Sequence, residues 1–322
     1  MKVRAIALVL ALLVPALPAQ AANTVLIGVA YDTGGLGDLS YNDATAAGIK
    51  MVRTGAEFVS VVTDGSAKNR EARLRTLISK GANPIIAIGA GYVPALNKLA
   101  IEYPETQFAI MNDATIEALN VTSIVFADIQ GAYLAGAAAA LTSKSGKVAM
   151  IASPNQNALF TQGFSAGAIA ARKKVKVSVQ YSATNQGLLA RNLIAAGNDV
   201  IFMGTSGSVD EAFSEIVKAN KAKKSVGLIS VEPDQYLTVT KSTQKYLYAT
   251  VEKRADRAMR DFIKASIAGE QFLDFLDPDK GIYGRRYGIK GGGIEIALRL
   301  PSLAAQSSAI NALSSLAEKI SA

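Results

Sequence analysis

The 322-residue sequence contains no cysteine, no histidine and no tryptophan, and only 19% of its residues are charged. Without cysteine, disulfides and thiolate metal sites are excluded. Without histidine, the chain has no Ser-His or Cys-His nucleophilic pair and no imidazole ligand for zinc. Any catalysis would therefore depend on carboxylates, lysine or tyrosine, and we expect neither a metal nor a cofactor.

Half of the residues are apolar, which is enough for a large core and excludes a disordered protein. The formal net charge is +8, and the small lysine clusters contain no aromatic residues. Such clusters are typical of a solvated surface, whereas nucleic-acid sites combine basic and aromatic side chains. We therefore expect a globular protein without a nucleic-acid partner.

The N-terminus has the pattern of a secretory signal. Lys2 and Arg4 precede an apolar run over residues 5–17, and the sequence Ala-Gln-Ala ends at Ala21. The run is shorter than the roughly 20 residues that cross a bilayer. We expect residues 1–21 to be removed on export to the periplasm, and no lipid anchor, because no cysteine follows the run.

Strand-like and helix-like segments alternate from Thr24 onward, which predicts parallel sheets with helices on both faces. This alternation of strand-like and helix-like segments begins again near Val148. We therefore expect two similar α/β lobes that share topology without a sequence repeat. The expected strands cover residues 25–31, 58–62, 84–88, 108–111, 124–126, 148–152, 175–181, 200–203, 226–231 and 246–251.

Beyond the last of these strands we expect a helix over 253–267, a glycine-rich segment over 281–293 and a final helix after Pro301. A strand and a helix that follow the complete second unit would return to the first lobe and create a hinge. The prediction is one lobe of residues 22–126 plus about 249–276, and a second lobe of residues 127–248 plus about 277–322.

Polar residues follow the predicted strands at the point where each strand ends. Ligands of parallel α/β sheets bind beyond the carboxyl ends of the strands, so these residues are the first candidates for a binding site. They are Asp32, Asp64, Asn112, Asp113, Gly204, Thr205, Ser206, Gly207 and Glu232.

The loop over 31–48, YDTGGLGDLSYNDATAAG, follows the first predicted strand. Its glycines allow the backbone to approach a ligand, and Ser40 has the position of an N-cap for a helix whose first turn presents Tyr41 and Asn42. The glycine spacing matches neither the dinucleotide fingerprint nor the ATP-binding loop. A flexible turn before a capped helix explains the same residues, so composition leaves both interpretations open.

The end of this loop, SYND (40–43), resembles the Asp-Gly-Gly…Ser-Phe-Asn signature of the basic membrane protein family, the purine nucleoside receptor type of ABC-transporter substrate-binding protein. The resemblance continues in order over most of the chain after the signal. It includes PETQFAIMND (104–113), NVTSIVFADIQGAYLAGAAAAL (120–141), KVAMIASPNQNALFTQGFSAG (147–167), SVEPDQ (230–235) and YATVEKRADRAM (248–259).

The resemblance implies the hinged, two-lobed fold of type I periplasmic binding proteins, with a ligand held between the lobes. In the first lobe it implies that Asp32 and Asn42 hydrogen-bond the ligand. Tyr41, in the position of the family's phenylalanine, would stack on a base. Asn112 or Asp113 would supply a further polar contact, since the register there is ambiguous by one residue.

In the second lobe, Glu232 falls where the family has an aspartate that binds ribose hydroxyls. Lys253, after the predicted strand over 246–251, falls on the family's lysine at the start of a helix. An ion pair between Lys253 and Glu232 is the alternative. Phe160 and Phe202 are candidates for a second stacking contact, and packing in the core is the alternative for both rings.

These residues suit a neutral, hydroxyl-bearing ring, because carboxylates and amides bind hydroxyls and would repel an anion. We interpret the protein as a monomeric periplasmic binding protein that captures a small ligand, with a purine nucleoside as the first choice, for an ABC permease of the inner membrane. Two alternatives stay open. One is a secreted hydrolase of glycosidic bonds that uses Asp32 and Glu232, and the other is a sensor component.

Overall fold

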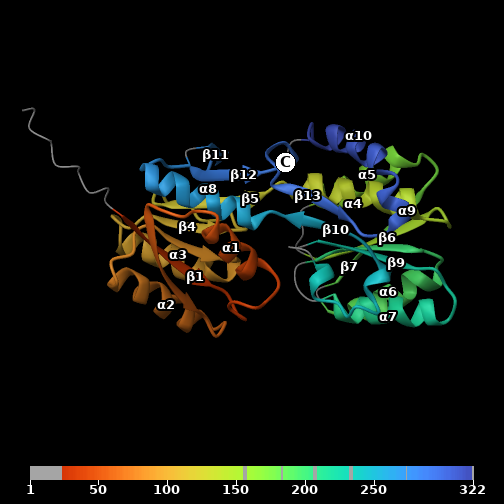
Figure 1. The fold of residues 1–322 in the computed structure, drawn as a ribbon, viewed down its shortest axis with the longest axis horizontal. Helices are drawn as coiled ribbons and strands as arrows, with labels where there is room; N and C mark the ends of the chain where they lie inside the picture. The colour runs from red at the N-terminus through yellow and green to blue at the C-terminus, as the bar shows by residue number, and fades with distance from the viewer. Residues whose placement is uncertain are drawn as a thin grey trace, which may run out of the picture.

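The computed structural model describes residues 24–154, 158–182, 184–205, 209–231, 235–272 and 274–320. They form two α/β lobes that lie side by side along the long axis of the molecule (Figure 1). The expected fold class, two lobes that each contain a mainly parallel sheet flanked by helices, is confirmed. The expected signal over 1–21 lies outside the described residues.

The first lobe is built mainly from the N-terminal part of the chain. Its sheet has the strand order β11-β12-β5-β4-β3-β1-β2, in which all neighbours are parallel except β11 and β12. The first elements are β1 (Val25–Tyr31), α1 (Tyr41–Lys50), β2 (Ala56–Val62), α2 (Ala67–Ser79), β3 (Ile85–Ile88), η1 (Ala90–Tyr92), α3 (Val93–Glu102), β4 (Phe108–Met111) and β5 (Val121–Phe126).

The second lobe repeats this arrangement around a sheet of order β13-β10-β9-β8-β6-β7, in which β13 runs antiparallel to β10. Its first elements are α4 (Asp128–Thr142), β6 (Lys147–Ala152), α5 (Ala158–Ala171), β7 (Lys176–Tyr181), α6 (Gln186–Ala195), β8 (Val200–Gly204), α7 (Asp210–Lys221), β9 (Gly227–Val231), η2 (Gln235–Leu237), η3 (Gln244–Tyr246) and β10 (Leu247–Lys253).

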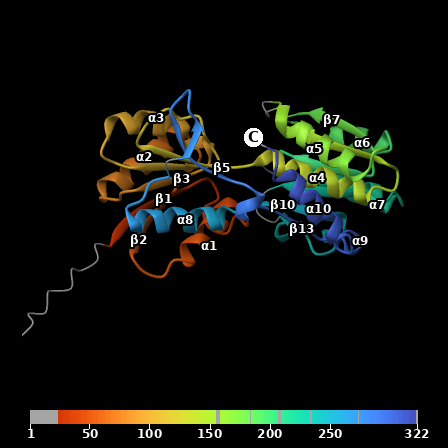
Figure 2. The ribbon, with the colours of Figure 1, turned by 90° about the horizontal axis from the view of Figure 1, so that it is seen from above.

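The chain then returns to the first lobe and ends in the second. α8 (Ala255–Ala268), β11 (Asp274–Asp277) and β12 (Ile282–Tyr287) belong to the first lobe, where α8 packs against α1 (Figure 2). η4 (Ile289–Gly291), β13 (Ile294–Leu298), α9 (Pro301–Ala304) and α10 (Ser307–Ala317) complete the second lobe. No helix in the described part of the chain is long and apolar enough to cross a membrane.

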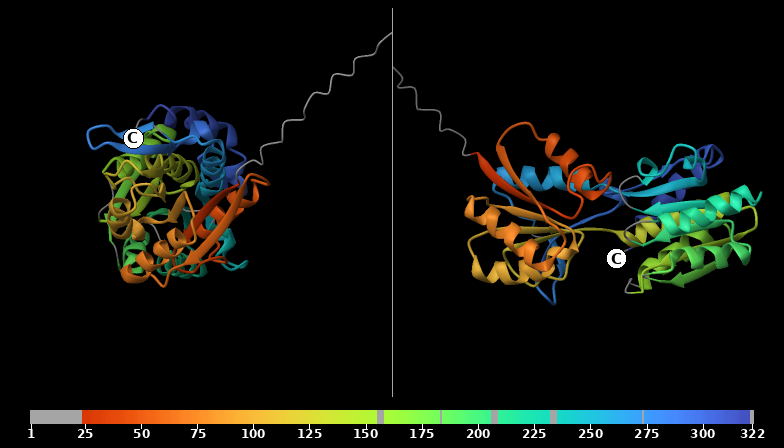
Figure 3. Two further views of the ribbon diagram at one scale, coloured as in Figure 1. Left: turned by 90° about the vertical axis from the view of Figure 1, so that its left-hand side faces the viewer. Right: turned by 90° about the horizontal axis from the view of Figure 1, so that it is seen from below.

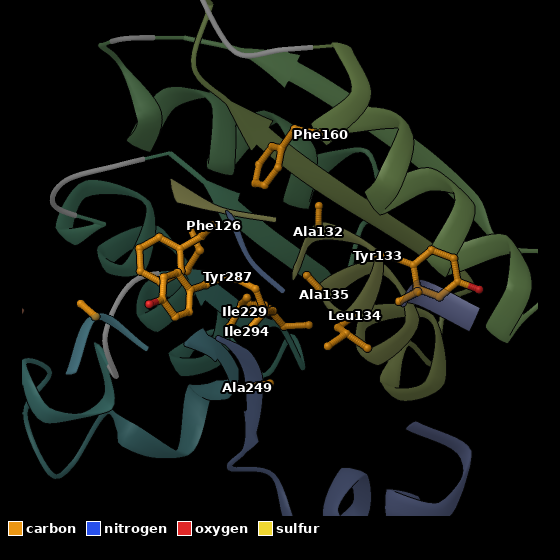
Figure 4. Close-up of a cluster of buried hydrophobic side chains, with 14 of the residues drawn as sticks. Phe126, Ala132, Tyr133, Leu134, Ala135, Phe160, Ile229, Ala249, Tyr287 and Ile294 are labelled. Atoms are coloured by element: carbon orange, nitrogen blue, oxygen red, sulfur yellow. The ribbon is translucent and has the colours of Figure 1, made fainter. Parts of the chain in front are cut away.

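Three segments pass between the lobes, where β5 runs into α4, β10 into α8 and β12 into η4 (Figure 2; Figure 3, right). The Ala127 amide donates to the Tyr287 carbonyl over 2.8 Å, and the Arg254 amide donates to the Gly293 carbonyl over 2.9 Å. The rings of Phe126 and Tyr287, which end neighbouring strands, have centroids 6.1 Å apart (Figure 4). The crossing segments are therefore held together where the chain changes lobe.

Ion pairs also connect the two lobes beside the second crossing. Glu295 of β13 lies 2.7 Å from the guanidinium of Arg254 and 2.7 Å from that of Arg257 at the start of α8. Arg254 also pairs with Asp256 over 2.6 Å. Because all four side chains are partly exposed, each pair stabilises the contact by no more than about 1 kcal/mol.

The apolar core of the second lobe surrounds α4, which is buried over most of its length. Figure 4 shows side chains of α4 gathered with Phe160, Ile229 and Ile294 in one buried cluster. Small residues let α5 approach α4 closely, since a Cβ atom added at Gly167 would lie 1.9 Å from the Tyr133 carbonyl oxygen. The alanine-rich sequence thus reflects close packing of two helices.

The boundaries of the lobes differ from the expected ones at the two later crossings. We expected the chain to enter the first lobe at about residue 249 and to leave it at about 276. β10 instead pairs with β9 of the second sheet, so the chain crosses after Lys253. β12 pairs with β5, so the first lobe continues to Tyr287. The apolar pattern of β10 predicts a buried strand but does not indicate which sheet it joins.

The glycine-rich segment over 281–293, where we expected no strand, contains β12. A Cβ atom added at Gly284 would lie 1.8 Å from the carbonyl oxygen of Ser123, its partner on β5. Glycine is required here by the close approach of two strands, although in the sequence it resembles a turn signal.

Candidate ligand-binding site

The candidate site lies where the carboxyl edges of the two sheets face each other. β5 leaves the first lobe from the carboxyl end of its sheet and runs into α4 of the second lobe, and β10 leaves the second lobe in the opposite sense. Asp32, Gly89 and Asn112 follow β1, β3 and β4 at the first edge, and Lys253 ends β10 at the second. The topology therefore brings these residues toward a common region.

Asn42 fastens the loop after β1 to the start of α1. Its side chain is 2% exposed, and its Oδ1 accepts from the Asp32 amide over 3.1 Å. Its Nδ2 donates to the carbonyl oxygens of Asp32 at 3.3 Å and Thr33 at 3.4 Å. These bonds fix the backbone at Asp32, so the position of Asp32 depends on Asn42.

The expectation that the Ser40 side chain caps α1 is wrong. Ser40 is the N-cap residue by position, but its side chain makes no capping hydrogen bond. The Asp38 carboxylate accepts instead from the amides of Ser40 at 2.9 Å, Asn42 at 3.2 Å and Asp43 at 3.1 Å. A carboxylate beside a helix N-terminus is favoured by the helix dipole as well.

Only one oxygen of the Asp32 carboxylate, Oδ1, has contacts to donors among the described residues. Its Oδ1 accepts from the Thr33 amide over 2.9 Å and lies 2.7 Å from Nη2 of Arg70 on α2. None of the described residues donates a hydrogen bond to Oδ2, and the side chain is 31% exposed. Asp32 therefore presents one unsatisfied, negatively charged acceptor at the edge of the sheet.

Asn112 and Asp113 occupy different environments. Asn112 has a φ of 69°, a left-handed conformation that asparagine tolerates, and its Oδ1 accepts from Lys253 Nζ over 3.5 Å. Asp113 forms a local turn, in which its Oδ1 accepts from the amide of Thr115 at 2.8 Å and from its hydroxyl at 2.6 Å. Asn112 is thus the one in contact with the second lobe.

Lys253 joins both lobes at the second crossing. The residue is 8% exposed, and its Nζ lies 2.9 Å from Oδ1 of Asp128, the first residue of α4. Together with the contact to Asn112, this ion pair places a buried ammonium group between β4, α4 and β10. Glu232, the other expected partner, lies outside the described residues.

The three aromatic candidates all pack against apolar core residues. Tyr41 is half-buried in the first turn of α1. Phe160 is 4% exposed, with its ring centroid 6.0 Å from that of Phe202. A Cβ atom at Gly204 would lie 2.8 Å from Cε1 of Phe160, so Gly204 makes room for this ring. Stacking of any of these rings on a ligand remains a prediction.

A cavity of about 320 Å³ lies beside Lys253, between the loop before α1 and the second crossing. Its lining includes residues from both lobes, namely Leu39, Ser40, Asp43, Ala44, Ala47, Leu237, Glu252, Lys253, Arg254 and Asp256. Side chains of the two lobes therefore border a common space. The residues described by the structure contain no group of three or more Asp or Glu side chains that could hold a metal ion.

Sequence reasoning missed Arg70, Asp38 and Asp128, three charged residues that organise this region. Arg70 occurs in the polar sequence KNREARLR at the start of α2, which is typical of a solvated helix face. Asp38 and Asp128 carry the signal of an acidic residue near a helix start, and this signal was available in the sequence.

Comparisons with known proteins show the family of the chain. Residues 25–320 match the family model described as ABC transporter substrate-binding protein PnrA-like. The chain is 28% identical over 264 residues to the CD4+ T-cell-stimulating antigen of Listeria monocytogenes serovar 1/2a, covering 76% of this chain and 74% of that protein. It is 25% identical over 291 residues to the ABC transporter nucleoside-binding protein BmpA of Lactococcus lactis subsp. cremoris, covering 84% and 80%.

Among solved structures, an ABC transporter solute-binding protein from Aeropyrum pernix K1 has a similar fold, with a TM-score of 0.68 and 21% sequence identity. The superposition covers 92% of this chain and 90% of that one. The family match extends over nearly all of the described chain, from β1 to beyond α10. The chain therefore belongs to the PnrA-like family of ABC transporter substrate-binding proteins.

Proposed function

We propose that this chain captures a purine nucleoside between its two lobes and delivers it to an ABC permease. Members of the family are extracytoplasmic substrate-binding proteins and not enzymes, so the chain itself binds a solute and does not convert it. The nucleoside is the part of the proposal that requires further support. That support comes from the chemistry of the candidate site and from the name of the Lactococcus lactis relative.

The observation that carries the proposal is the free carboxylate oxygen of Asp32. Oδ2 receives no hydrogen bond from the described residues, and Asp32 directly follows β1 at the carboxyl edge of the first sheet. A charged acceptor of this kind favours a ligand that brings its own donors, such as ribose hydroxyls or a base N–H group. Tyr41, in the first turn of α1, is the proposed stacking surface for the base.

The charges near the site favour a nucleoside over a nucleotide. Among the described residues near the site, the cations Arg70 and Lys253 are mostly buried, and each pairs with a carboxylate, at 2.7 and 2.9 Å. A phosphate group would have to compete with Asp32 or Asp128 for these cations. Phosphate recognition usually relies on cations that are available for it. The proposed ligand is therefore neutral.

Binding is proposed to close the lobes. A ligand that contacts residues of both lobes binds the closed arrangement more tightly and shifts the population toward it. The three crossing segments supply the hinge, and Lys253, which contacts Asn112 of the first lobe over 3.5 Å, lies at the point about which the lobes would turn.

Calorimetry on protein freed of bound ligand by unfolding and refolding tests the ligand class. Adenosine, guanosine and inosine are titrated, with adenosine monophosphate as the matched anionic control and ribose as the control without a base. We expect nucleosides to bind and the monophosphate to bind at least tenfold more weakly. The proposal fails if no nucleoside binds, or if the monophosphate binds as tightly.

The remaining parts of the proposal concern processing and assembly. We infer that residues 1–21 are removed on export to the periplasm, that no lipid is attached, because the sequence has no cysteine, and that the product is a monomer. The mass of the exported protein tests the first two points, since it should equal that of residues 22–322 without modification. Light scattering during size-exclusion chromatography tests the third.

A further inference from the structure

Arg70 connects three loops at the carboxyl edge of the first sheet. Its Nη2 lies 2.7 Å from Oδ1 of Asp32 in the loop after β1, and its Nη1 donates to the carbonyl oxygen of Gly65 in the loop after β2. Its Cζ lies 5.7 Å from the ring centroid of Tyr92, which follows β3. The side chain is 16% exposed, so most of it is shielded from water.

The space around this guanidinium is shaped to hold it. A Cβ atom at Gly91 would lie 2.6 Å from Cζ of Arg70, so any other residue at this position would displace the guanidinium. The Tyr92 hydroxyl donates to the Tyr31 carbonyl over 2.8 Å, which fixes the ring beneath Arg70. Burial, and then the charge of Asp32, raise the pKa of Tyr92, so this hydroxyl remains a donor at neutral pH.

The contacts of Arg70 determine which oxygen of Asp32 is left for a ligand. Arg70 and the Thr33 amide both use Oδ1, and Oδ2 receives no hydrogen bond from the described residues. Without Arg70, a single hydrogen bond from the Thr33 amide would hold the carboxylate, and its χ2 torsion, which has only a broad intrinsic preference, would vary more widely. The guanidinium also balances the negative charge of Asp32, whereas a neutral ligand would leave that charge unbalanced.

We propose that Arg70 is a positioning residue for ligand binding, which holds the Asp32 carboxylate by Oδ1 and so leaves Oδ2 for the ligand. Gly91 contributes to this positioning, because its lack of a side chain leaves room for the guanidinium of Arg70. The inference rests on the proposed function, since it assigns Asp32 to the ligand. It extends that function to Arg70 of α2 and Gly91 of η1.

Calorimetry with a purine nucleoside on four variants tests the inference. Arg70→Met removes the guanidinium, and Gly91→Ala displaces it without changing any charge. Gly91 does not have a positive φ, so alanine at this position is compatible with its backbone. We expect each substitution to weaken binding about tenfold, the value of one well-oriented charged hydrogen bond.

The double variant and the conservative variant separate positioning from general damage. Because both single substitutions act on the same guanidinium, Arg70→Met with Gly91→Ala should bind no more weakly than Arg70→Met alone. Arg70→Lys should lie between wild type and Arg70→Met, because an ammonium group can reach Asp32 or Gly65 but does not match the fork that contacts both. Additive losses, or an unchanged affinity of Arg70→Met, would overturn the inference.

A ligand-free crystal structure of the Arg70→Met variant tests the inference without the nucleoside. We expect the Asp32 carboxylate to leave the orientation that it has beside Arg70. If the carboxylate keeps this orientation, the inference is wrong even if nucleosides bind. If it rotates while wild-type protein binds no nucleoside, the positioning role stands and the proposed ligand class fails. Should Arg70→Met not fold, the Gly91→Ala structure replaces it.

Discussion

The substitution Asp32→Asn separates the role of Asp32 in binding from its role in the loop. The new amide oxygen can still accept from the Thr33 amide and from Arg70, which contact Oδ1 at 2.9 and 2.7 Å. The group at the position of Oδ2 changes from a charged acceptor to an N–H donor. The shape of the loop is thus preserved, while the atom proposed to face the ligand is reversed in character.

The two effects of this substitution differ in size. A hydrogen bond to a charged group contributes about 1.5–3 kcal/mol, which corresponds to a ten- to hundredfold loss of affinity. The ion pair with Arg70 is 31% exposed on the Asp32 side, so its loss should cost the folded state no more than about 1 kcal/mol. We therefore expect a large change in binding and a shift in melting temperature of a few degrees at most.

Calorimetry and thermal unfolding of the ligand-free protein measure these two quantities. Asp64→Asn is the matched control, because Asp64 follows β2 at the same edge and its Oδ1 accepts from the exposed Ser66 amide over 2.8 Å. The control should bind as wild type does. If Asp32→Asn binds with unchanged affinity, or if the control loses as much affinity, Asp32 is not the acceptor that we assign.

Three further predictions concern stability. Glu295→Gln, which removes the charge that connects β13 to α8, should lower the free energy of unfolding in urea by about 1 kcal/mol, and an unchanged value would show that these pairs do not stabilise the fold. Gly167→Ala should lower the free energy of unfolding by about 1–3 kcal/mol, because the added methyl group crowds α4 against α5. Gly291→Ala is the control, since its Cβ would meet no atom within 4 Å, and it should change this free energy by no more than about 0.5 kcal/mol. Equal effects of the two substitutions would contradict this packing. The hydrogen bond from Arg191 lowers the pKa of Glu215 to about 2, so Glu215→Gln should reduce stability at pH 7, and the deficit should disappear as the pH falls from 4.5 toward 2; a constant deficit would refute this linkage.

Strands buried on both faces were the most predictable part of the fold. β1 and β4 have the expected bounds, because short apolar runs end at polar residues on the carboxyl side. The edge strands β11 and β13 and the glycine-containing β12 were missed. Their residues are partly exposed, and their pairing depends on close contacts that hydrophobic pattern does not encode.

Site residues could be predicted where their place in the sequence and the topology of the sheet determine where they lie. Asp32 and Asn112 follow parallel strands and therefore reach the expected edge. The partners of these residues were not predictable, because Arg70 is 38 positions from Asp32 and Lys253 is 141 positions from Asn112. The amide of Asn42, expected to bind ligand, is engaged with the backbone of Asp32 and Thr33. Its direct contact with a ligand thus stays a prediction.

A crystal structure of the protein with its bound nucleoside tests the central claim most directly. Capture between the lobes predicts a donor of the ligand within hydrogen-bond distance of Asp32 Oδ2, and further contacts to the same molecule from the second lobe. A nucleoside that touches one lobe alone, or that lies away from Asp32, would contradict the account.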